Sequence, residues 1–319
     1  MNQHIKANSA FKAGSAKEAN SAAEANGANE ANGMNKDLEP KIRNLTPEIR
    51  NPPLEIRNLH GLTDTHAHLS YLGERGIPAA ALLDGLFAAG FGFILDIGTD
   101  GDDLTPRIAQ FAGYPNVRFA CGIWPYKDRI GRIQEGETML RRQIEAAPPG
   151  AVVAVGECGF DLRENPGMPP EEAAFFEMQL SLAQEYNVPV IVHSREAAVR
   201  TIETLRRFPA VTGVIHCFSY TKAEAQTFLD MGYYISFAGN LTFKNAAALR
   251  EAAAFIPDGR LLLETDSPFL APMPYRGGVC HPGMVRETYQ CAAGLRGTDL
   301  AGLKETVRQN ARRLFYVGI

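Results

Sequence analysis

Beyond residue 60, short apolar runs alternate along the chain with segments whose apolar residues recur every three or four positions. The short runs are rich in valine, isoleucine and leucine, which is typical of strands covered on both faces of a sheet. The intervening segments, such as 82–87 and 175–183, have the spacing of helices that pack against such a sheet. The pattern predicts strands at 61–69, 92–98, 117–123, 152–156, 188–192, 213–215, 233–237 and 261–263.

Eight strand-and-helix units predict an α/β fold. They occupy about 260 residues, which matches the size of a (β/α)8 TIM-type barrel. We therefore assign residues 59–319 to one barrel domain. An open, doubly wound sheet is the alternative, but polar residues suited to one site follow both the first and the last strand. That placement favours a closed barrel.

The first 58 residues differ in composition from the rest of the chain. Up to about Met34 the sequence is built of alanine, asparagine, glutamate, glycine and serine, and Ile-Arg-Asn then recurs at 42, 49 and 56 among four prolines. Prolines at this density interrupt any continuous helix, and the segment has too little apolar surface to offset the entropy of ordering. We predict a disordered, low-complexity tail over 1–58.

Two histidines, His66 and His68, lie on one face of the first predicted strand, because side chains alternate along a strand. Imidazole is a good ligand for divalent first-row metals. A pair of core histidines bonded to main-chain carbonyls is the alternative interpretation.

Further ligand-type residues follow other apolar runs. Glu157, His193 and His216 come directly after the predicted fourth, fifth and sixth strands, and Glu264 and Asp266 follow the eighth. The carboxyl ends of barrel strands meet at one mouth. Four histidines and two or more carboxylates gathered there can hold two divalent ions, with one carboxylate bridging them.

These residues sit in motifs that resemble, in order and spacing, those of the TatD-type metal-dependent deoxyribonucleases. The resemblance runs from about Leu59 to Phe315. The motifs are Leu62-Thr63-Asp64-Thr65-His66-Ala67-His68-Leu69, Ala154-Val155-Gly156-Glu157-Cys158-Gly159-Phe160-Asp161, Pro189-Val190-Ile191-Val192-His193-Ser194-Arg195, Val214-Ile215-His216-Cys217-Phe218-Ser219 and Leu263-Glu264-Thr265-Asp266-Ser267-Pro268.

The resemblance implies a TIM-like barrel of the amidohydrolase type that binds two divalent metals and hydrolyses phosphodiester bonds in DNA. The metals would be magnesium, manganese or zinc. By the same resemblance, one metal would be held by His66, His68, Glu157 and Asp266, and the other by Glu157, His193 and His216.

Some residues are candidates for roles beyond metal binding. Asp266 is the candidate for orienting or deprotonating the attacking water, with Glu157 as the bridging catalytic carboxylate. Asp64 and Glu264 lie one pleat deeper, where carboxylates orient ligating imidazoles, although an internal salt bridge is an equal alternative. Arg195 and Arg276 are candidates for clamping phosphate, or ordinary surface arginines.

The chain departs from the family pattern in three places. Trp124 occupies the position after the third strand where the family usually has histidine, Tyr220 replaces an expected glycine, and His281 precedes Pro282. Tryptophan cannot ligate a metal, but its face can stack on a base, as that of Tyr220 can. The alternative for Trp124 is simple loop packing.

Composition narrows the partners. The net charge is −4, and the first 59 residues carry eight basic and seven acidic side chains, which leaves the barrel about −5. Proteins that bind long duplexes are usually basic, so we expect single strands or strand ends as the DNA substrate.

No apolar run is long enough to cross a membrane, and no obligate protein partner is evident. Five scattered cysteines favour a reduced, cytoplasmic protein, and alternation points Cys158 and Cys217 away from the metals.

Two other function classes remain open. The chain could be a barrel hydrolase of another ester or an amide, such as an aminoacyl ester. Relatives of that kind often bridge their metals with a carboxylated lysine, whereas Glu157 fills that place here. A non-catalytic metal-binding scaffold would be expected to have lost a ligand, and none is missing.

Overall fold

The computed structural model describes residues 59–167 and 169–316. Its core is one sheet of eight parallel strands, each hydrogen-bonded to the next in chain order. Apolar, β-branched runs such as Val190–Val192 form these strands because both faces of the sheet are covered. The strands are β1 (Thr63–Ala67), β2 (Phe93–Ile97), β3 (Val117–Cys121), β4 (Val152–Asp161), β5 (Val190–Arg195), β6 (Gly213–Ile215), β7 (Tyr234–Phe237) and β8 (Leu261–Leu263).

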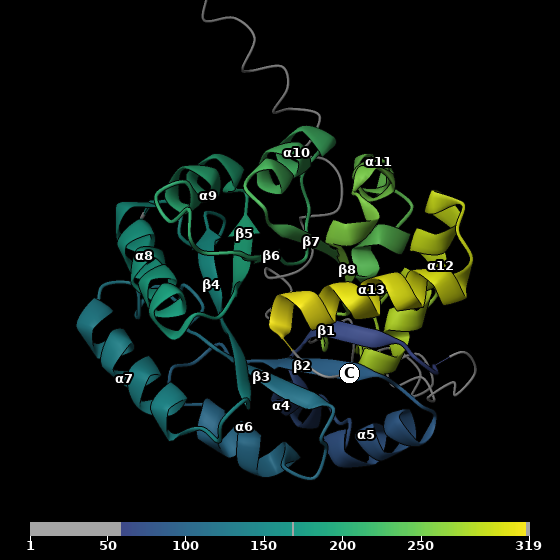
Figure 1. Cartoon of the computed structure of the whole chain (residues 1–319), viewed down its shortest axis with the longest axis horizontal. Helices are drawn as coiled ribbons and strands as arrows, with labels where there is room; N and C mark the ends of the chain where they lie inside the picture. The colour runs from purple at the N-terminus through teal and green to yellow at the C-terminus, as the bar shows by residue number, and fades with distance from the viewer. Residues whose placement is uncertain (1–58, 168, 317–319) are drawn as a thin grey trace, which may run out of the picture.

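Helices lie around the outside of the sheet (Figure 1). Their ends follow local sequence: Thr221 and Glu224 form a capping box at the start of α10, and Gly297 ends α12 in a left-handed conformation. The α-helices are α4 (Leu69–Glu74), α5 (Ala79–Ala88), α6 (Leu104–Phe111), α7 (Ile133–Ala146), α8 (Pro169–Tyr186), α9 (Ala198–Leu205), α10 (Lys222–Asp230), α11 (Ala247–Phe255), α12 (Val285–Arg296) and α13 (Leu300–Phe315), with short 3-10 turns η2 (Gly239–Thr242), η3 (Asp258–Arg260) and η4 (Pro282–Met284).

The first and last strands meet at their carboxyl ends. The amide of Asp266 donates to the carbonyl of His66 at 2.9 Å, and the amide of His68 donates to the carbonyl of Ser267 at 2.8 Å. Ala67 and Ser267 form a parallel bridge. These bonds bring the residues after β8 beside β1, which confirms the predicted barrel architecture.

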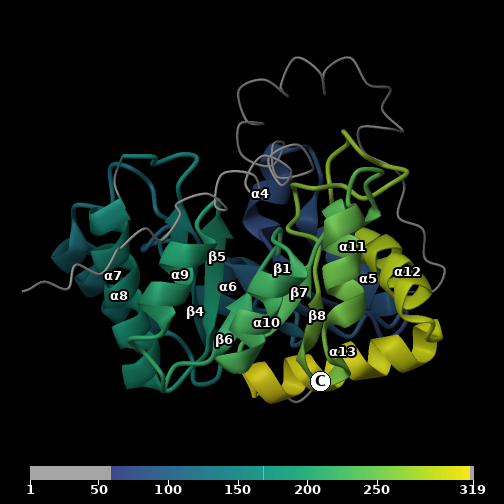
Figure 2. The ribbon, with the colours of Figure 1, turned by 90° about the horizontal axis from the view of Figure 1, so that it is seen from above.

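Helix α13 covers the opposite, amino end of the barrel, as Figure 2 shows. Asn310 of this helix donates to the carbonyl of Leu261, where β8 begins, and Lys304 donates to the carbonyl of His60, just before β1. The amino end is thereby closed by a helix, so the loops at the carboxyl end form the accessible mouth.

The predicted strands all occur, and those at 213–215 and 261–263 have the predicted bounds. The fourth differs, because β4 continues past Gly156 to Asp161 and stays paired with β5 as far as Arg195. Glu157 and His193 therefore lie within strands and not after them. The tail predicted over 1–58 lies outside the described residues.

Within the described ranges, no helix combines the length and the apolar character that crossing a membrane requires. The five cysteines are all free thiols. The cytoplasmic location stays a prediction.

Candidate metal centre

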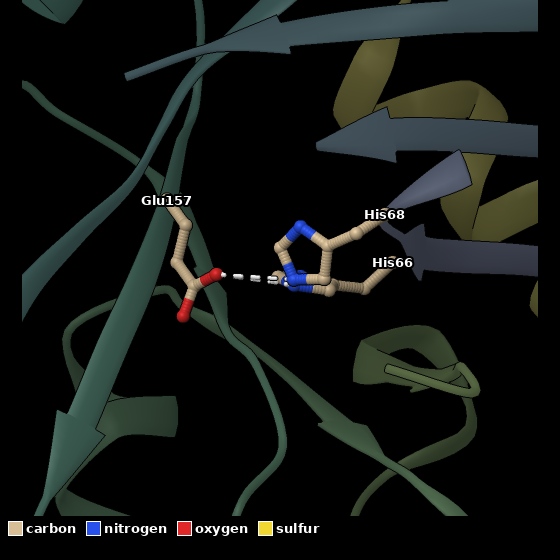
Figure 3. Close-up of side chains that lie close together, drawn as sticks. All are labelled: His66, His68 and Glu157. Carbon is tan, nitrogen blue, oxygen red and sulfur yellow. Dashed lines mark hydrogen bonds and ion pairs between the residues drawn. The ribbon is translucent and has the colours of Figure 1, made fainter. Parts of the chain in front are cut away.

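Six predicted ligands come together at the carboxyl end of the barrel. His66 lies in β1, Glu157 in β4 and His193 in β5. His68 and His216 directly follow β1 and β6, and Asp266 lies three residues after the end of β8. Every one of them is buried, with residue exposures between 0 and 8%. Figure 3 shows the carboxylate of Glu157 pointing from its strand toward the paired rings of His66 and His68. The complete set is His66, His68, Glu157, His193, His216 and Asp266.

On the β1/β8 side, four ligand atoms lie close together. They are His66 Nε2, His68 Nε2, Glu157 Oε2 and Asp266 Oδ1, and the five pairs of these atoms with a measured separation lie 3.3 to 3.6 Å apart. Atoms that ligate a zinc ion tetrahedrally at about 2.1 Å lie about 3.4 Å from one another, which is within the range of these five separations. This side of the site therefore fits a small divalent cation.

The other oxygen of Glu157 faces the second set of ligands. Glu157 Oε1 lies 2.7 Å from His193 Nδ1 and 2.9 Å from His216 Nε2, and these two nitrogens are 3.2 Å apart. One carboxylate thus presents an oxygen to each pair of histidines. That is the arrangement of a carboxylate that bridges two metals.

Electrostatics within the cluster follow from burial and pairing. Burial alone would raise the pKa of Glu157, but the charge on His216 and hydrogen bonds from His193 and His216 hold it well below its usual range. Burial, together with the charge on His216, lowers the pKa of His66. Glu157 therefore stays a carboxylate and His66 a neutral imidazole, which are the protonation states that ligate metals.

Asp161 is a carboxylate beside the candidate ligands that the sequence reasoning missed. Its Oδ2 lies 2.9 Å from His193 Nε2, while its Oδ1 accepts hydrogen bonds from the amides of Arg163 and Glu164. Burial would lower the pKa of His193, yet Asp161 and Glu157 together raise it to about 9. The signal was present, because Asp161 stands four residues after Glu157 on the same strand and so shares its face.

Of the two carboxylates predicted to orient imidazoles, one contacts a ring. Glu264 Oε1 lies 3.4 Å from His216 Nδ1 and accepts a hydrogen bond from the amide of Cys217. Asp64 instead accepts hydrogen bonds from the amides of His66 and Thr265 and from the Thr265 hydroxyl. Asp64 joins β1 to the segment after β8, so its effect on His66 passes through the main chain.

The cluster opens into a cavity of about 500 Å3. Trp124 and Arg195 line it, and the Trp124 ring lies 5.5 Å from the ring of His193, between centroids. Arg276 is not among the described lining residues: its guanidinium lies over the ring of Phe243, 4.3 Å from the centroid. Tyr220 is also outside the lining, and its hydroxyl hydrogen bonds with Ser194.

Other lining residues were not predicted. Tyr71, Tyr126 and Phe269 add aromatic surface, and Asn240 adds an amide. Tyr71 and Asn240 lie in the short elements α4 and η2 and the other two on loops, where no periodic pattern shows which way a side chain points.

Cys217 requires a correction, because it lines the cavity instead of pointing away from it. Its φ of 45° places it in the left-handed region, so the strand alternation on which the expectation rested ends at His216. Cys158 does lie in the core, fully buried in β4.

A glycine allows β4 and β5 to approach closely beside the site. A Cβ added at Gly159 would lie 1.9 Å from the carbonyl oxygen of His193, and the φ of Gly159 is +147°. Any other residue would push β5 away. Gly159 therefore helps to place His193 against Glu157.

Comparison with known proteins places the chain among related hydrolases. It is 41% identical over 204 residues to a protein of Escherichia coli (strain K12) named uncharacterized metal-dependent hydrolase YcfH, an alignment that covers 63% of this chain and 75% of that one. It is 31% identical over 258 residues to the uncharacterized metal-dependent hydrolase YabD of Bacillus subtilis (strain 168), covering 80% and 99%. Among solved structures, the E. coli TatD homolog YJJV superposes with a TM-score of 0.73 at 28% identity, covering 82% of this chain and 100% of that one.

The family model described as "TatD related DNase" matches residues 63–316, which include all six clustered ligands. The chain therefore belongs to the TatD-related DNase family.

Proposed function

We propose that this protein is a two-metal hydrolase of phosphodiester bonds that acts as a deoxyribonuclease on single-stranded ends of DNA. The observation that carries the proposal is Glu157, whose two oxygens each face a separate pair of histidines. Membership of the TatD family and the names of the metal-dependent hydrolases that it resembles support the hydrolytic class.

Two divalent ions, when bound, would neutralise the phosphate and make a water molecule a stronger nucleophile at neutral pH. His66, His68, Glu157 and Asp266 would hold one ion, and Glu157, His193 and His216 the other. The chain's own part is to fix these ligands in a buried cleft, where the charges act with little screening.

Asp266 is our candidate for the general base. It is 8% exposed and lines the cavity, so its carboxylate is accessible from the side on which a substrate enters. In the proposed reaction, Asp266 takes a proton from the attacking water as the new P–O bond forms and the bond to the leaving sugar oxygen breaks. The leaving oxygen then takes up a proton from water, and the hydroxide formed in that transfer takes the proton from Asp266.

Substrate contacts follow from the cavity walls. Arg195 is 5% exposed and lies beside Asp161, with 3.9 Å between Arg195 Nη1 and Asp161 Oδ2. Its guanidinium is suited to a phosphate oxygen next to the metals. The ring of Trp124 offers a surface for a terminal base. A cavity of about 500 Å3 suits a small ligand or a strand end and not a duplex.

The decisive experiment uses metal-depleted protein that is re-supplied with magnesium, manganese or zinc. It is assayed on end-labelled single- and double-stranded DNA and RNA, with Asp266→Asn as the inactive control. We expect metal-dependent shortening of single-stranded DNA from an end. Hydrolysis of aminoacyl esters or lactones in the absence of any phosphodiester cleavage would overturn the nuclease assignment.

A further inference from the structure

The cavity has two flanks on opposite sides of the metal ligands. Trp124 follows β3, and Asn240 lies in η2, which begins two residues after β7. In a closed barrel of eight strands in chain order, β3 and β7 are four positions apart and lie across the mouth from each other. Both residues line the same cavity. The cavity therefore offers a side chain on each side of the candidate ligands.

Asn240 carries a buried amide oxygen without a hydrogen-bond partner among the described residues. It is 6% exposed, and within residues 59–167 and 169–316 its Oδ1 has no hydrogen-bond partner. Buried amide oxygens are rarely left in that state, because desolvation without a partner is costly. Asn240 also lines the cavity, so a rotation of its side-chain amide would turn this buried oxygen toward a ligand.

The main chain holds Asn240 in a fixed place. Its carbonyl accepts a hydrogen bond of 3.1 Å from the amide of Phe243. The preceding residue, Gly239, packs so closely on the next loop that an added Cβ would lie 2.1 Å from the carbonyl oxygen of Leu270. Asn240 is thus presented by a rigid turn, which is what a specific contact requires.

We propose that Asn240 determines specificity: its amide oxygen accepts a hydrogen bond from the nucleoside on the side of the scissile phosphate opposite to Trp124. The proposal rests on the proposed phosphodiesterase function. An acceptor needs a donor, and a phosphodiester has none at neutral pH. Base N–H groups and sugar hydroxyls are the donors that a nucleic acid end offers.

The test compares two diesters. A thymidine dinucleotide carries both kinds of donor, whereas bis(p-nitrophenyl) phosphate carries none. Asn240→Leu removes the amide at similar volume, and Asn240→Ala is a second variant in case leucine perturbs the fold. Asn245→Ala, an exposed asparagine five residues further on, is the matched control.

We expect Asn240→Leu to raise KM for the dinucleotide about tenfold, because a site built to hydrogen-bond a substrate discriminates against losing that bond. Activity on bis(p-nitrophenyl) phosphate, metal content and melting temperature should match the wild type, as should Asn245→Ala in every assay. Dinucleotides with an abasic residue or lacking the 3′ hydroxyl identify the donor. The substrate on which wild type and Asn240→Leu no longer differ lacks the group that Asn240 binds.

An equal loss on both diesters would overturn the proposal, since Asn240 would then support the site and not the substrate. An unchanged KM on the dinucleotide would overturn it as well. Failure of the proposed function looks different: the wild type would cleave neither diester with any metal. Dinucleotide binding can be followed without turnover, because Trp124 is the single tryptophan of the chain and its fluorescence reports on the cavity. Unweakened binding to Asn240→Leu in that assay would also refute the contact.

Discussion

The two halves of the candidate metal centre contain the same kinds of side chain but support them differently. In the β4–β6 half, the outer nitrogens of both histidines face carboxylates: Asp161 hydrogen bonds with His193 at 2.9 Å, whereas Glu264 lies 3.4 Å from His216 without forming a hydrogen bond. In the β1/β8 half, the outer nitrogen of His68 meets the carbonyl of Ile97 at 3.2 Å. That of His66 has no hydrogen-bond partner in the described part of the chain.

Because of this difference, the two halves differ in the protons and hydrogen bonds that a metal has to displace. A carboxylate behind an imidazole makes the ring a stronger base and a stronger ligand. Such rings also hold a proton when no metal is bound, as the raised pKa values of His193 and His216 indicate. The ligand atoms of the β1/β8 half stand 3.3 to 3.6 Å apart in the five measured pairs. Those of the β4–β6 half are closer, at 2.7 to 3.2 Å, so a metal there must replace short hydrogen bonds.

The largest effect should come from Asp266. Asp266→Asn keeps the shape of the side chain but loses the charge that binds metal and accepts a proton. We expect the turnover number to fall about 10³-fold or more. Steady-state kinetics on a single-stranded oligonucleotide, with circular dichroism as a check on folding, measure this.

Metal content gives a second measurement on Asp266→Asn, because the two halves of the site predict different losses of metal for different ligands. Asp266 forms ion pairs with His66 and His68, whereas Glu157 pairs with histidines of both halves. Asp266→Asn should therefore lower the metal content by one ion, and Glu157→Gln by two. Wild-type turnover in Asp266→Asn would show that this residue has no chemical role, and equal metal loss in the two variants would contradict separate halves.

His281 extends the comparison to stability. It lies in the loop after β8, is 5% exposed, and like His66 has an Nδ1 without a hydrogen-bond partner among the described residues. Burial lowers its pKa to about 4. Between pH 6.5 and about 4, His281 is therefore protonated in the unfolded chain but neutral in the folded protein. The free energy of unfolding decreases as the pH falls through this range.

The lowered pKa of His281 reduces the free energy of unfolding by about 3 kcal/mol at pH 4, since each pKa unit represents about 1.4 kcal/mol. The free energy of unfolding of wild type minus that of His281→Gln should decrease by this amount from pH 7 to pH 4. Denaturant titrations at each pH measure it. The subtraction removes acid effects that the two proteins share, and a constant difference would mean that His281 finds a partner when protonated.

Asp161 tests the carboxylate support directly. Asp161→Asn keeps the size of the side chain but removes the charge behind His193, so we expect one metal site to weaken roughly 10- to 100-fold. The other site should change by less than threefold, an order-of-magnitude bound set by the separation of the halves. Calorimetric titration of metal-depleted protein resolves the two affinities. Equal weakening of both sites would show that the halves act as one unit through Glu157.

Much of the fold and of the ligand set could be predicted because both follow from regular patterns. The apolar runs 213–215 and 261–263 became strands with those bounds, and alternation placed His66 and His68 on one face. The end of β4 was misjudged because Glu157 and Asp161 are polar, yet they face the barrel interior. Polarity that serves a site interrupts the pattern that reveals a strand.

Loop residues were beyond this reasoning. Trp124 and Arg276 both follow strands, and nothing periodic distinguishes the one that lines the cavity from the one that stacks on Phe243. Cys217 turned toward the cavity because a single left-handed residue broke the alternation. Such positions depend on tertiary contacts that a sequence pattern does not encode.

The smallest expected effect comes from the aromatic residues on which a terminal base could stack. It tests which half of the site binds that base. Trp124 lies against His193 of the β4–β6 half, whereas Phe269 lies against His68 of the β1/β8 half, with ring centroids 5.5 and 6.0 Å apart. If the terminal base stacks on Trp124, Trp124→Ala should weaken binding of a short single strand by roughly 1 kcal/mol. This is the low end of a base–aromatic contact, because Tyr126, 4.9 Å away between centroids, retains part of the surface. Phe269→Ala is the matched control and should leave affinity within about twofold. Competition binding of a labelled oligonucleotide to metal-loaded protein measures both variants. If Phe269→Ala weakens oligonucleotide binding and Trp124→Ala does not, the terminal base stacks in the β1/β8 half. If Trp124→Ala lowers only the thermal stability, Trp124 is a packing residue.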